Sequence, residues 1–398
     1  MELIIQDWLS LLLRWLHIIT AIAWIGGSFF FIWLDLSLRR KEGMDKGVQG
    51  DTWMVHGGGF YHAEKWLVAP ANLPKELHWF KYESYFTWLS GFALMAVIYY
   101  WGAETYLIDR SVMDMSVSVA ISISVLGLYG GWAVYDLLCR SALGKNTGTL
   151  AISVFVFLVV ASWGYGEVFS ARAAFLHVGA LIATIMTANV FFIIIPNQKK
   201  VVAALTAGET PNPNLGIQAK QRSTHNNYLT LPVLFMMMSN HYPFTYSNEP
   251  NWLVAALVII LGGVIRDYFN ASHAGGTGNR VRFQWPLSAI IILLLIYITG
   301  GEAMLAQNPN TAGMTSDARV MEIMELHCTS CHAINPTSEY FDNPPLDVTL
   351  ESKADIIKFA PKVYSQTILS TAMPLGNESG MSQNERDELQ NWLDGQNK

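Results

Sequence analysis

The residues of this chain best suited to chemistry are Cys328, Cys331 and His332, which form a C-x-x-C-H run. This run is typical of covalent attachment of a c-type haem, because two thiols one helical turn apart can add to the two vinyl groups of the porphyrin. The histidine that follows presents its imidazole to the iron. We therefore predict a covalent c-type haem and, with it, a role in electron transfer.

Two other interpretations of this run are weaker. Half of a zinc site would need a second Cys/His pair at finger-like spacing, and the remaining cysteine, Cys139, lies far upstream. A redox dithiol usually belongs to a βαβ pattern, whereas residues 317–326 have a helical pattern. The haem is the interpretation that the spacing favours.

A second axial ligand to the haem is expected further along the tail, on a loop. Met373 stands in a T-A-M-P run, and its thioether would raise the reduction potential of the haem. Met381 is the alternative, but it directly precedes Ser382 and Glu385, which form an S-x-x-E capping box at the start of a final helix. We predict Met373 as the ligand. Residues 315–398 as a whole resemble a small class I cytochrome c domain.

The rest of the chain is too apolar for a soluble domain. Hydrophobic residues make up 52% of the sequence and charged residues only 14%. The tail from Thr311 onward differs, because it carries thirteen acidic and six basic side chains. We predict an all-α membrane domain over residues 1–303, a linker over 304–314 and a soluble domain over 315–398. No nucleic-acid patch, P-loop or dinucleotide fingerprint is present in the sequence.

The membrane domain contains eight apolar stretches close to the length that crosses a bilayer. Their predicted bounds are 8–33, 82–101, 115–138, 149–169, 173–195, 226–242, 252–269 and 284–299. The loops on one side of these spans hold fifteen Lys/Arg, while the opposite loops hold only Arg110 and Arg172. The positive-inside rule therefore places both termini in the periplasm of a bacterial inner membrane. Covalent haem attachment, which is periplasmic in bacteria, requires the same orientation.

The two halves of the membrane domain resemble each other. Trp15-Leu16-His17-Ile18 in the first span matches Phe175-Leu176-His177-Val178 in the fifth, which fits a duplicated four-helix unit. Histidines inside spans are costly and usually functional. His17 and His177 are therefore either axial ligands of a non-covalent b-type haem in the bundle or neutral imidazoles that pack between helices.

Polar residues that could act on a substrate gather in two places. The first is a glycine-rich segment that contains His56, His62 and Glu64, in which the glycines permit close approach of a ligand and the side chains could move protons. The second is the S-N-H-Y-P run around His241, at the outer end of the sixth span. The alternatives are a re-entrant loop without a ligand at the first place and a helix cap at the second.

Several short motifs together carry a family resemblance. The run L-R-W-L-H-I-I from Leu13, followed by A-W-I-G-G from Ala23, resembles a group of small membrane proteins that includes a haem-associated bacterial protoporphyrinogen oxidase. With H-G-G-G-F-Y-H from His56, H-N-N-Y from His225 and S-N-H-Y-P from Ser239, the whole chain looks like the bacterial membrane urate oxidases fused to cytochrome c.

The resemblance implies a reaction that the residues alone do not predict. Members of this family oxidise urate to 5-hydroxyisourate, with the added hydroxyl coming from water and the electrons passing through the c-type haem to a respiratory cytochrome or terminal oxidase. Two alternatives from other classes stay open. One is a respiratory subunit that exchanges electrons with quinol or a partner complex without urate chemistry, and the other is a transporter with a redox sensor.

Overall fold

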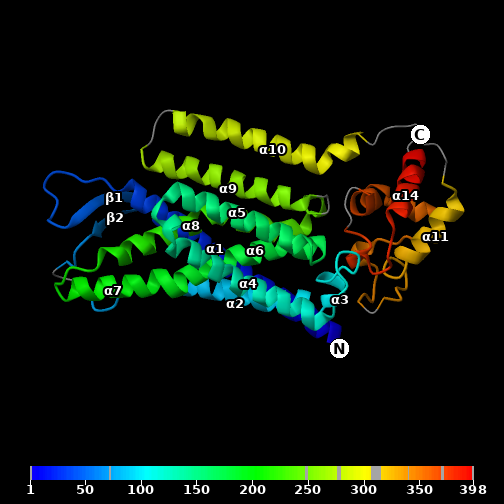
Figure 1. Ribbon diagram of the computed structural model, residues 1–398, viewed down its shortest axis with the longest axis horizontal. Helices are drawn as coiled ribbons and strands as arrows, with labels where there is room; N and C mark the ends of the chain where they lie inside the picture. Colours follow the sequence, from blue (N-terminus) through cyan, green and yellow to red (C-terminus); the bar gives the residue numbers. More distant parts are fainter. Residues whose placement is uncertain are drawn as a thin grey trace.

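The computed structural model describes residues 2–70, 73–246, 250–275, 279–305, 315–338, 340–368 and 372–396. A long helical bundle carries a small two-stranded hairpin at one end and a compact helical C-terminal domain at the other (Figure 1). Most of the predicted linker, residues 306–314, lies outside the described residues.

All eight predicted spans fall on helices of the bundle. These helices are α1 (Glu2–Ser37), α2 (Tyr82–Met95) with η1 (Ala96–Tyr100), α4 (Val117–Arg140), α5 (Thr147–Gly166), α6 (Ala171–Ala188) with η3 (Asn189–Ile194) and α7 (Ile195–Thr206), α8 (Pro213–Met238), α9 (Asn251–His273) and α10 (Asn279–Leu305). Among the described residues, six helices are long and apolar enough to cross a membrane. The spans on α2–η1 and on α8 are not among those six.

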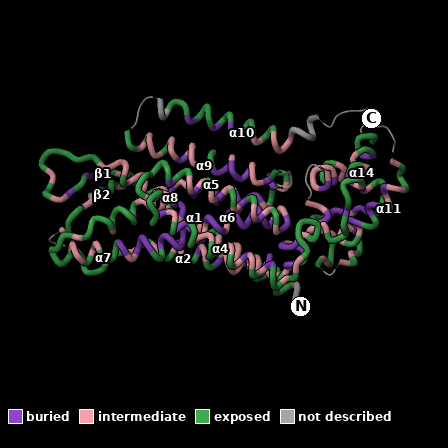
Figure 2. Tube along the Cα trace, viewed as in Figure 1, coloured by how far each residue is buried: buried purple, intermediate pink, exposed green. Residues whose placement is uncertain are grey.

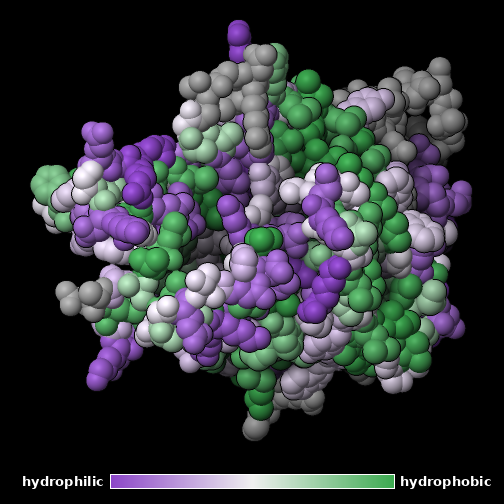
Figure 3. Space-filling model, turned by 60° about the vertical axis from the view of Figure 1, so that its left-hand side comes forward, coloured by the Kyte–Doolittle hydropathy of each residue, from purple (hydrophilic) through white to green (hydrophobic). Residues whose placement is uncertain are grey.

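The bundle is built around α6. Nearly every side chain of α6 is buried, whereas α1 and α10 expose rows of large apolar side chains on the flank (Figure 2). Apolar surfaces of this extent mark contact with another hydrophobic phase, which for helices of this length is lipid. Figure 3 shows the complementary feature, since hydrophilic side chains gather over the end of the bundle that carries the hairpin.

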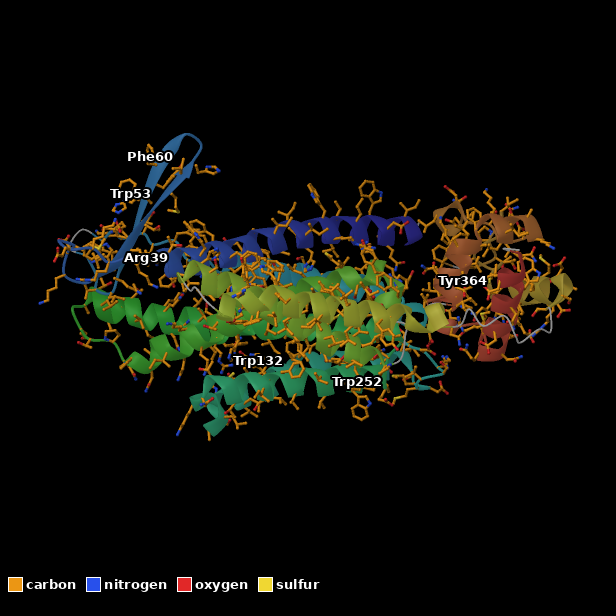
Figure 4. The ribbon with its side chains drawn as sticks, turned by 90° about the horizontal axis from the view of Figure 1, so that it is seen from above. Arg39, Trp53, Phe60, Trp132, Trp252 and Tyr364 are labelled. Carbon is orange, nitrogen blue, oxygen red and sulfur yellow. The ribbon has the colours of Figure 1, made fainter. Side chains whose placement is uncertain are left out.

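The glycine-rich segment is a β-hairpin, which the all-α prediction did not include. Strand β1 (Val48–His56) pairs antiparallel with β2 (Gly59–Trp66). Gly57 and Gly58 form the turn, with φ of +60° and +77°, a conformation that two-residue hairpin turns require and that glycine adopts without strain. The flanking Trp, Val, Phe and Tyr residues favour strands. Trp53 and Phe60 project away from the bundle (Figure 4).

The C-terminal domain is a small helical unit with its own core. It contains α11 (Asp317–His327), η6 (Pro345–Asp347), α12 (Lys353–Lys358), α13 (Ala360–Val363), η7 (Tyr364–Ile368), η8 (Leu375–Asn377) and α14 (Gln383–Gln396). Apolar side chains of α11 and α14 pack together, and Trp392 Nε1 donates to Asp317 Oδ1 at 2.7 Å. Tyr364 lies on the same domain (Figure 4).

The C-terminal domain contacts the bundle through the short helix α3 (Ala103–Tyr106), which meets η8. The approach is close, because a Cβ on Gly376 would lie 2.7 Å from the carbonyl oxygen of Thr105. The hairpin and the C-terminal domain therefore lie at opposite ends of the bundle.

Candidate functional site

The C-x-x-C-H residues follow directly on α11 and form one tight turn. The backbone amide of His332 donates to the carbonyl oxygen of Cys328 at 2.9 Å, which brings both cysteines and the histidine to one place. His332 Nδ1 lies 2.9 Å from the carbonyl oxygen of Val348. A histidine that donates from Nδ1 keeps Nε2 for a metal, and such a bond also fixes the orientation of the ring. The donor set fits a c-type haem.

The state of the first cysteine bears on the dithiol alternative. Burial raises the pKa of the Cys328 thiol to about 12. A redox-active dithiol needs a thiol whose pKa is lowered, since the thiolate is the nucleophile. This environment therefore favours covalent attachment over dithiol chemistry.

The two candidate methionine ligands have different surroundings. Met381 is 3% exposed and belongs to the core of the C-terminal domain. Met373 is half-buried and lies on a loop whose backbone is fixed by two bonds, one to the carbonyl oxygen of Gln366 at 2.9 Å and one from Arg386 to the Met373 carbonyl oxygen at 2.8 Å. A side chain that fills a core is poorly placed to reach an iron. Ligation by Met373 stays a prediction, and this arrangement favours it.

Two tyrosines of the bundle lie at or next to its junction with the C-terminal domain, which is formed by α3 and η8. Tyr106 of α3 is half-buried there, and burial raises the pKa of its hydroxyl although the nearby Arg172 acts in the opposite direction. The ring centroid of Tyr99 lies 6.2 Å from that of Tyr106. The contact between these two rings therefore leads from α3 into η1 of the bundle.

Polar side chains surround this aromatic pair. The guanidinium of Arg172, in the first turn of α6, lies 5.6 Å from the centre of the Tyr106 ring. The Asn240 side-chain oxygen accepts from the Tyr99 hydroxyl at 2.8 Å and from Arg172 Nε at 3.3 Å. His241 is exposed at this same end of the bundle. The hydrogen bonds with Tyr99 and Arg172 are made by its neighbour Asn240, which was not predicted from the sequence as a site residue.

His177 lies in the interior, behind Tyr99. Its ring is fully buried and packs on Phe169 at a centroid distance of 4.6 Å. Both ring nitrogens are engaged, Nδ1 with the carbonyl oxygen of Ala173 at 2.7 Å and Nε2 with the hydroxyl of Ser124 at 2.7 Å. Because neither nitrogen is left for iron, His177 does not fit a haem ligand in this arrangement.

His17 has a different environment. It lies against α2, where Nδ1 is 2.9 Å from the carbonyl oxygen of Thr87 and the ring fills the space that a Cβ on Gly91 would need. No described residue hydrogen-bonds its Nε2, so of these two membrane histidines only His17 keeps a nitrogen suited to a metal. The two histidines have different neighbours, since His17 contacts α2 whereas His177 packs against α4 and α5.

The hairpin residues form a separate polar group. His62 Nε2 lies 2.9 Å from Asp51, which Lys41 also contacts at 2.9 Å, and the His62 ring stacks on Trp53 at 4.3 Å. Hydrogen bonds from Lys41 and then His62 lower the pKa of the Asp51 carboxyl. His56 and Glu64 are exposed. The structure thus places three of the four predicted catalytic residues on the hairpin and His241 at the far end of the bundle.

A row of polar side chains on α8 was not assigned to a site from the sequence. Four consecutive residues each bond a different partner in the bundle: His225 with Tyr135 at 2.7 Å, Asn226 with Asn189 at 3.0 Å, Asn227 with Asn270 at 2.8 Å and Tyr228 with Asp267 at 2.8 Å. One turn earlier, Arg222 forms a buried ion pair with Asp136 at 2.6 Å. The signal that could have found this network is the polar H-N-N-Y run at the start of an apolar span.

Comparison with known proteins identifies the bundle. A family model described as urate oxidase N-terminal matches residues 3–300. No curated protein and no solved structure matches the chain.

Proposed function

We propose that this chain, which belongs to the urate oxidase N-terminal family, oxidises urate in its helical bundle and passes the electrons to a c-type haem held by its own C-terminal domain. The family match supports an oxidoreductase that acts on urate. The haem and its role as electron acceptor are our proposal, and they rest on Cys328, Cys331, His332 and Met373.

The proposed reaction balances without dioxygen. Urate and one water give 5-hydroxyisourate, two protons and two electrons, so that the new C–O bond carries the oxygen of water. A c-type haem held by Cys328, Cys331 and His332 would take up one electron at a time. The two electrons of each urate would therefore leave in two transfers, with a respiratory cytochrome or terminal oxidase as the acceptor after each one.

The observation that carries the proposal is the docking of the C-terminal domain on α3. Thr105 of α3 lies directly against Gly376 of the C-terminal domain, and the ring of the neighbouring Tyr106 contacts that of Tyr99 in the bundle. A haem held by Met373, three residues before Gly376, would thus lie near this end of the bundle. A tethered carrier is useful only if electrons reach it from the domain to which it is tethered, and this contact supplies the route.

The proposed location is a bacterial inner membrane, with both termini and the C-terminal domain in the periplasm. Six apolar helices among the described residues support membrane insertion. The loops rich in Lys and Arg connect the helices at the hairpin end, which would then face the cytoplasm. The C-terminal domain, at the other end, would face the compartment in which c-type haem is attached.

The test uses purified, haem-loaded protein in detergent without oxygen. Addition of urate should reduce the haem, with the spectrum of a ferrous c-type cytochrome and close to two haems reduced per urate consumed. A ubiquinol analogue, added to a second sample, tests the respiratory-subunit alternative. Haem that stays oxidised with urate and is reduced by quinol would refute urate oxidation. Formation of hydrogen peroxide in air, at the rate of urate loss, would refute the haem as acceptor.

A pyridine haemochrome assay on the same protein decides the non-covalent haem. The geometry favours one c-type haem per chain, because both nitrogens of His177 are engaged. A b-type haem in equal amount would instead point to His17, and its absorption should then be lost in His17→Ala but kept in His177→Ala.

A further inference from the structure

Arg266, in the second half of α9, is a buried cation without a carboxylate partner among the described residues. The side chain is 6% exposed, and its Nε has no hydrogen-bond acceptor in the part of the chain that the structure describes. Its guanidinium lies 4.2 Å from the centre of the Phe29 ring of α1. A charged group inside a membrane bundle is costly, and such groups usually mark a functional site.

The hydrogen bonds around Arg266 determine which atoms remain unpaired. Arg266 Nη2 donates to Asn270 Oδ1 at 3.1 Å, and Asn270 Nδ2 donates to Asn227 Oδ1 at 2.8 Å. Arginine has no acceptor, so Asn270 must turn its oxygen toward Arg266 and its amide nitrogen toward Asn227. Asn227 then presents its own amide nitrogen, which is without a partner among the described residues although the side chain is 1% exposed.

Both side-chain atoms that remain unpaired are hydrogen-bond donors. Arg266 Nε and Asn227 Nδ2 are joined through a single residue, Asn270, and one aromatic face lies beside them. Buried donors of this kind are nearly always paired, since each one left unpaired costs about 1–3 kcal/mol. A molecule that satisfies them must carry acceptors and a negative charge.

We propose that Arg266, Asn227 and Phe29 form the binding site for urate, between α1, α8 and α9. This inference rests on the proposed function and assigns its substrate site. Urate is a planar anion at neutral pH, with carbonyl oxygens around its edge. The guanidinium of Arg266 matches such an edge through more than one N–H, Asn227 donates to a second oxygen, and the ring of Phe29 contacts the guanidinium that holds the anion.

The site lies away from the C-terminal domain. Arg266 is the sixteenth residue of α9, counted from Asn251 at the end nearest the C-terminal domain, which corresponds to about 22 Å along the helix. Binding of urate and reduction of the haem are therefore separate events that two different measurements can follow.

The binding test uses full-length holoprotein in detergent, with the haem reduced beforehand by dithionite so that bound urate is not consumed. Equilibrium dialysis with radiolabelled urate gives the affinity of the wild type and of Arg266→Gln. The variant should bind urate at least about tenfold more weakly, as expected when one charge-assisted hydrogen bond is lost. Asn227→Asp should bind still more weakly, because its carboxylate would neutralise Arg266 and repel the anion.

Arg172 provides the matched comparison, since it is the arginine at the opposite end of the bundle and also has no carboxylate partner among the described residues. Arg172→Gln should leave the urate affinity within about twofold of wild type. An affinity that is unchanged in Arg266→Gln, or lost in Arg172→Gln instead, would overturn the proposal, as would a wild type that binds no urate. A far-ultraviolet circular dichroism spectrum and a detergent size-exclusion profile like those of the wild type show that the bundle of each variant has folded, since the C-terminal domain has a core of its own.

The urate site at Arg266 and the proposed function can be refuted separately. If the wild type binds urate through Arg266 but urate never reduces the oxidised haem, the site stands and the proposed function falls. If urate reduces the haem in the wild type and Arg266→Gln binds urate equally well, the proposed function stands and the site falls.

Discussion

Replacement of Gly376 by alanine should slow electron transfer from urate to the haem. The added Cβ would lie 2.7 Å from the carbonyl oxygen of Thr105, closer than carbon and oxygen approach without displacement, and the neighbouring atom is backbone that cannot turn aside. The C-terminal domain must therefore move away from α3. A loss of about 1.4 kcal/mol of docking free energy lowers the ratio of docked to undocked protein about tenfold, and the rate of haem reduction should fall as the docked population falls.

Gly380→Ala is the control for backbone strain. Both glycines have a left-handed backbone, with φ of +60° at Gly376 and +68° at Gly380, so alanine costs roughly 1–2 kcal/mol at either position. A Cβ on Gly380, however, meets nothing within 4 Å. Both variants should lose similar stability, and only Gly376→Ala should lose rate.

The assay is stopped-flow absorbance of the haem after anaerobic mixing with urate, compared with reduction by ascorbate, which reaches the haem from solution. Gly376→Ala should be slow with urate and normal with ascorbate. Equal rates with urate in the two variants would refute the reasoning, because they would show that the α3 contact does not limit transfer. Slow reduction of Gly376→Ala by both reductants would instead indicate damage to the haem site.

Three further predictions follow from other parts of the chain. Met373→Ala should abolish the far-red absorption band of the thioether-to-iron bond and lower the reduction potential of the haem. Met381→Ala should keep that band but lose about 2–5 kcal/mol of stability, because it leaves a cavity in the core. The reverse pattern would show that Met381 is the ligand and Met373 the packing residue. Hydrogen bonds from its capping-box partner lower the pKa of Glu385 from 4.5 to about 2, so its contribution to stability is complete above pH 4.5 and disappears as the pH falls toward 2. Acid unfolding of Glu385→Gln should lack this contribution, and an acid unfolding curve identical to that of wild type would contradict it. Reporter fusions after Lys41 and after Lys398 should give cytoplasmic and periplasmic signals respectively, and the opposite signal at either site would exclude the eight-span topology.

Much of the fold could be predicted from the sequence, because an apolar run of bilayer length has few alternatives to a helix. All eight predicted spans lie on helices. The hairpin was missed because its glycines suggested close approach to a ligand, although two adjacent glycines between Trp53, Val55, Phe60 and Tyr61 also favour a tight turn between strands. The strand-forming residues on both sides of the glycines therefore favour a hairpin over a ligand-binding loop.

The candidate site was much less predictable than the fold. Spacing alone brings Cys328 and His332 together, because they lie within one turn. Asn227 and Arg266, in contrast, are far apart in the sequence, and only the packing of α8 on α9 brings their networks together. A lone arginine in an apolar span indicates function, but the sequence does not say which groups surround it.

The two predicted spans that are less apolar than the others, on α2 and α8, bring polar groups into the bundle. α2 and α8 are not among the six helices apolar enough to cross a bilayer, yet each packs within the bundle. α2 supplies the carbonyl oxygen of Thr87 to His17, and α8 carries the row from His225 to Tyr228, which bonds α4, α6–η3 and α9. Polar groups can remain at membrane depth only where neighbouring helices pair them. Both helices therefore bring polar groups to bilayer depth because they are enclosed by their neighbours, and the proposed substrate site takes Asn227 from one of them.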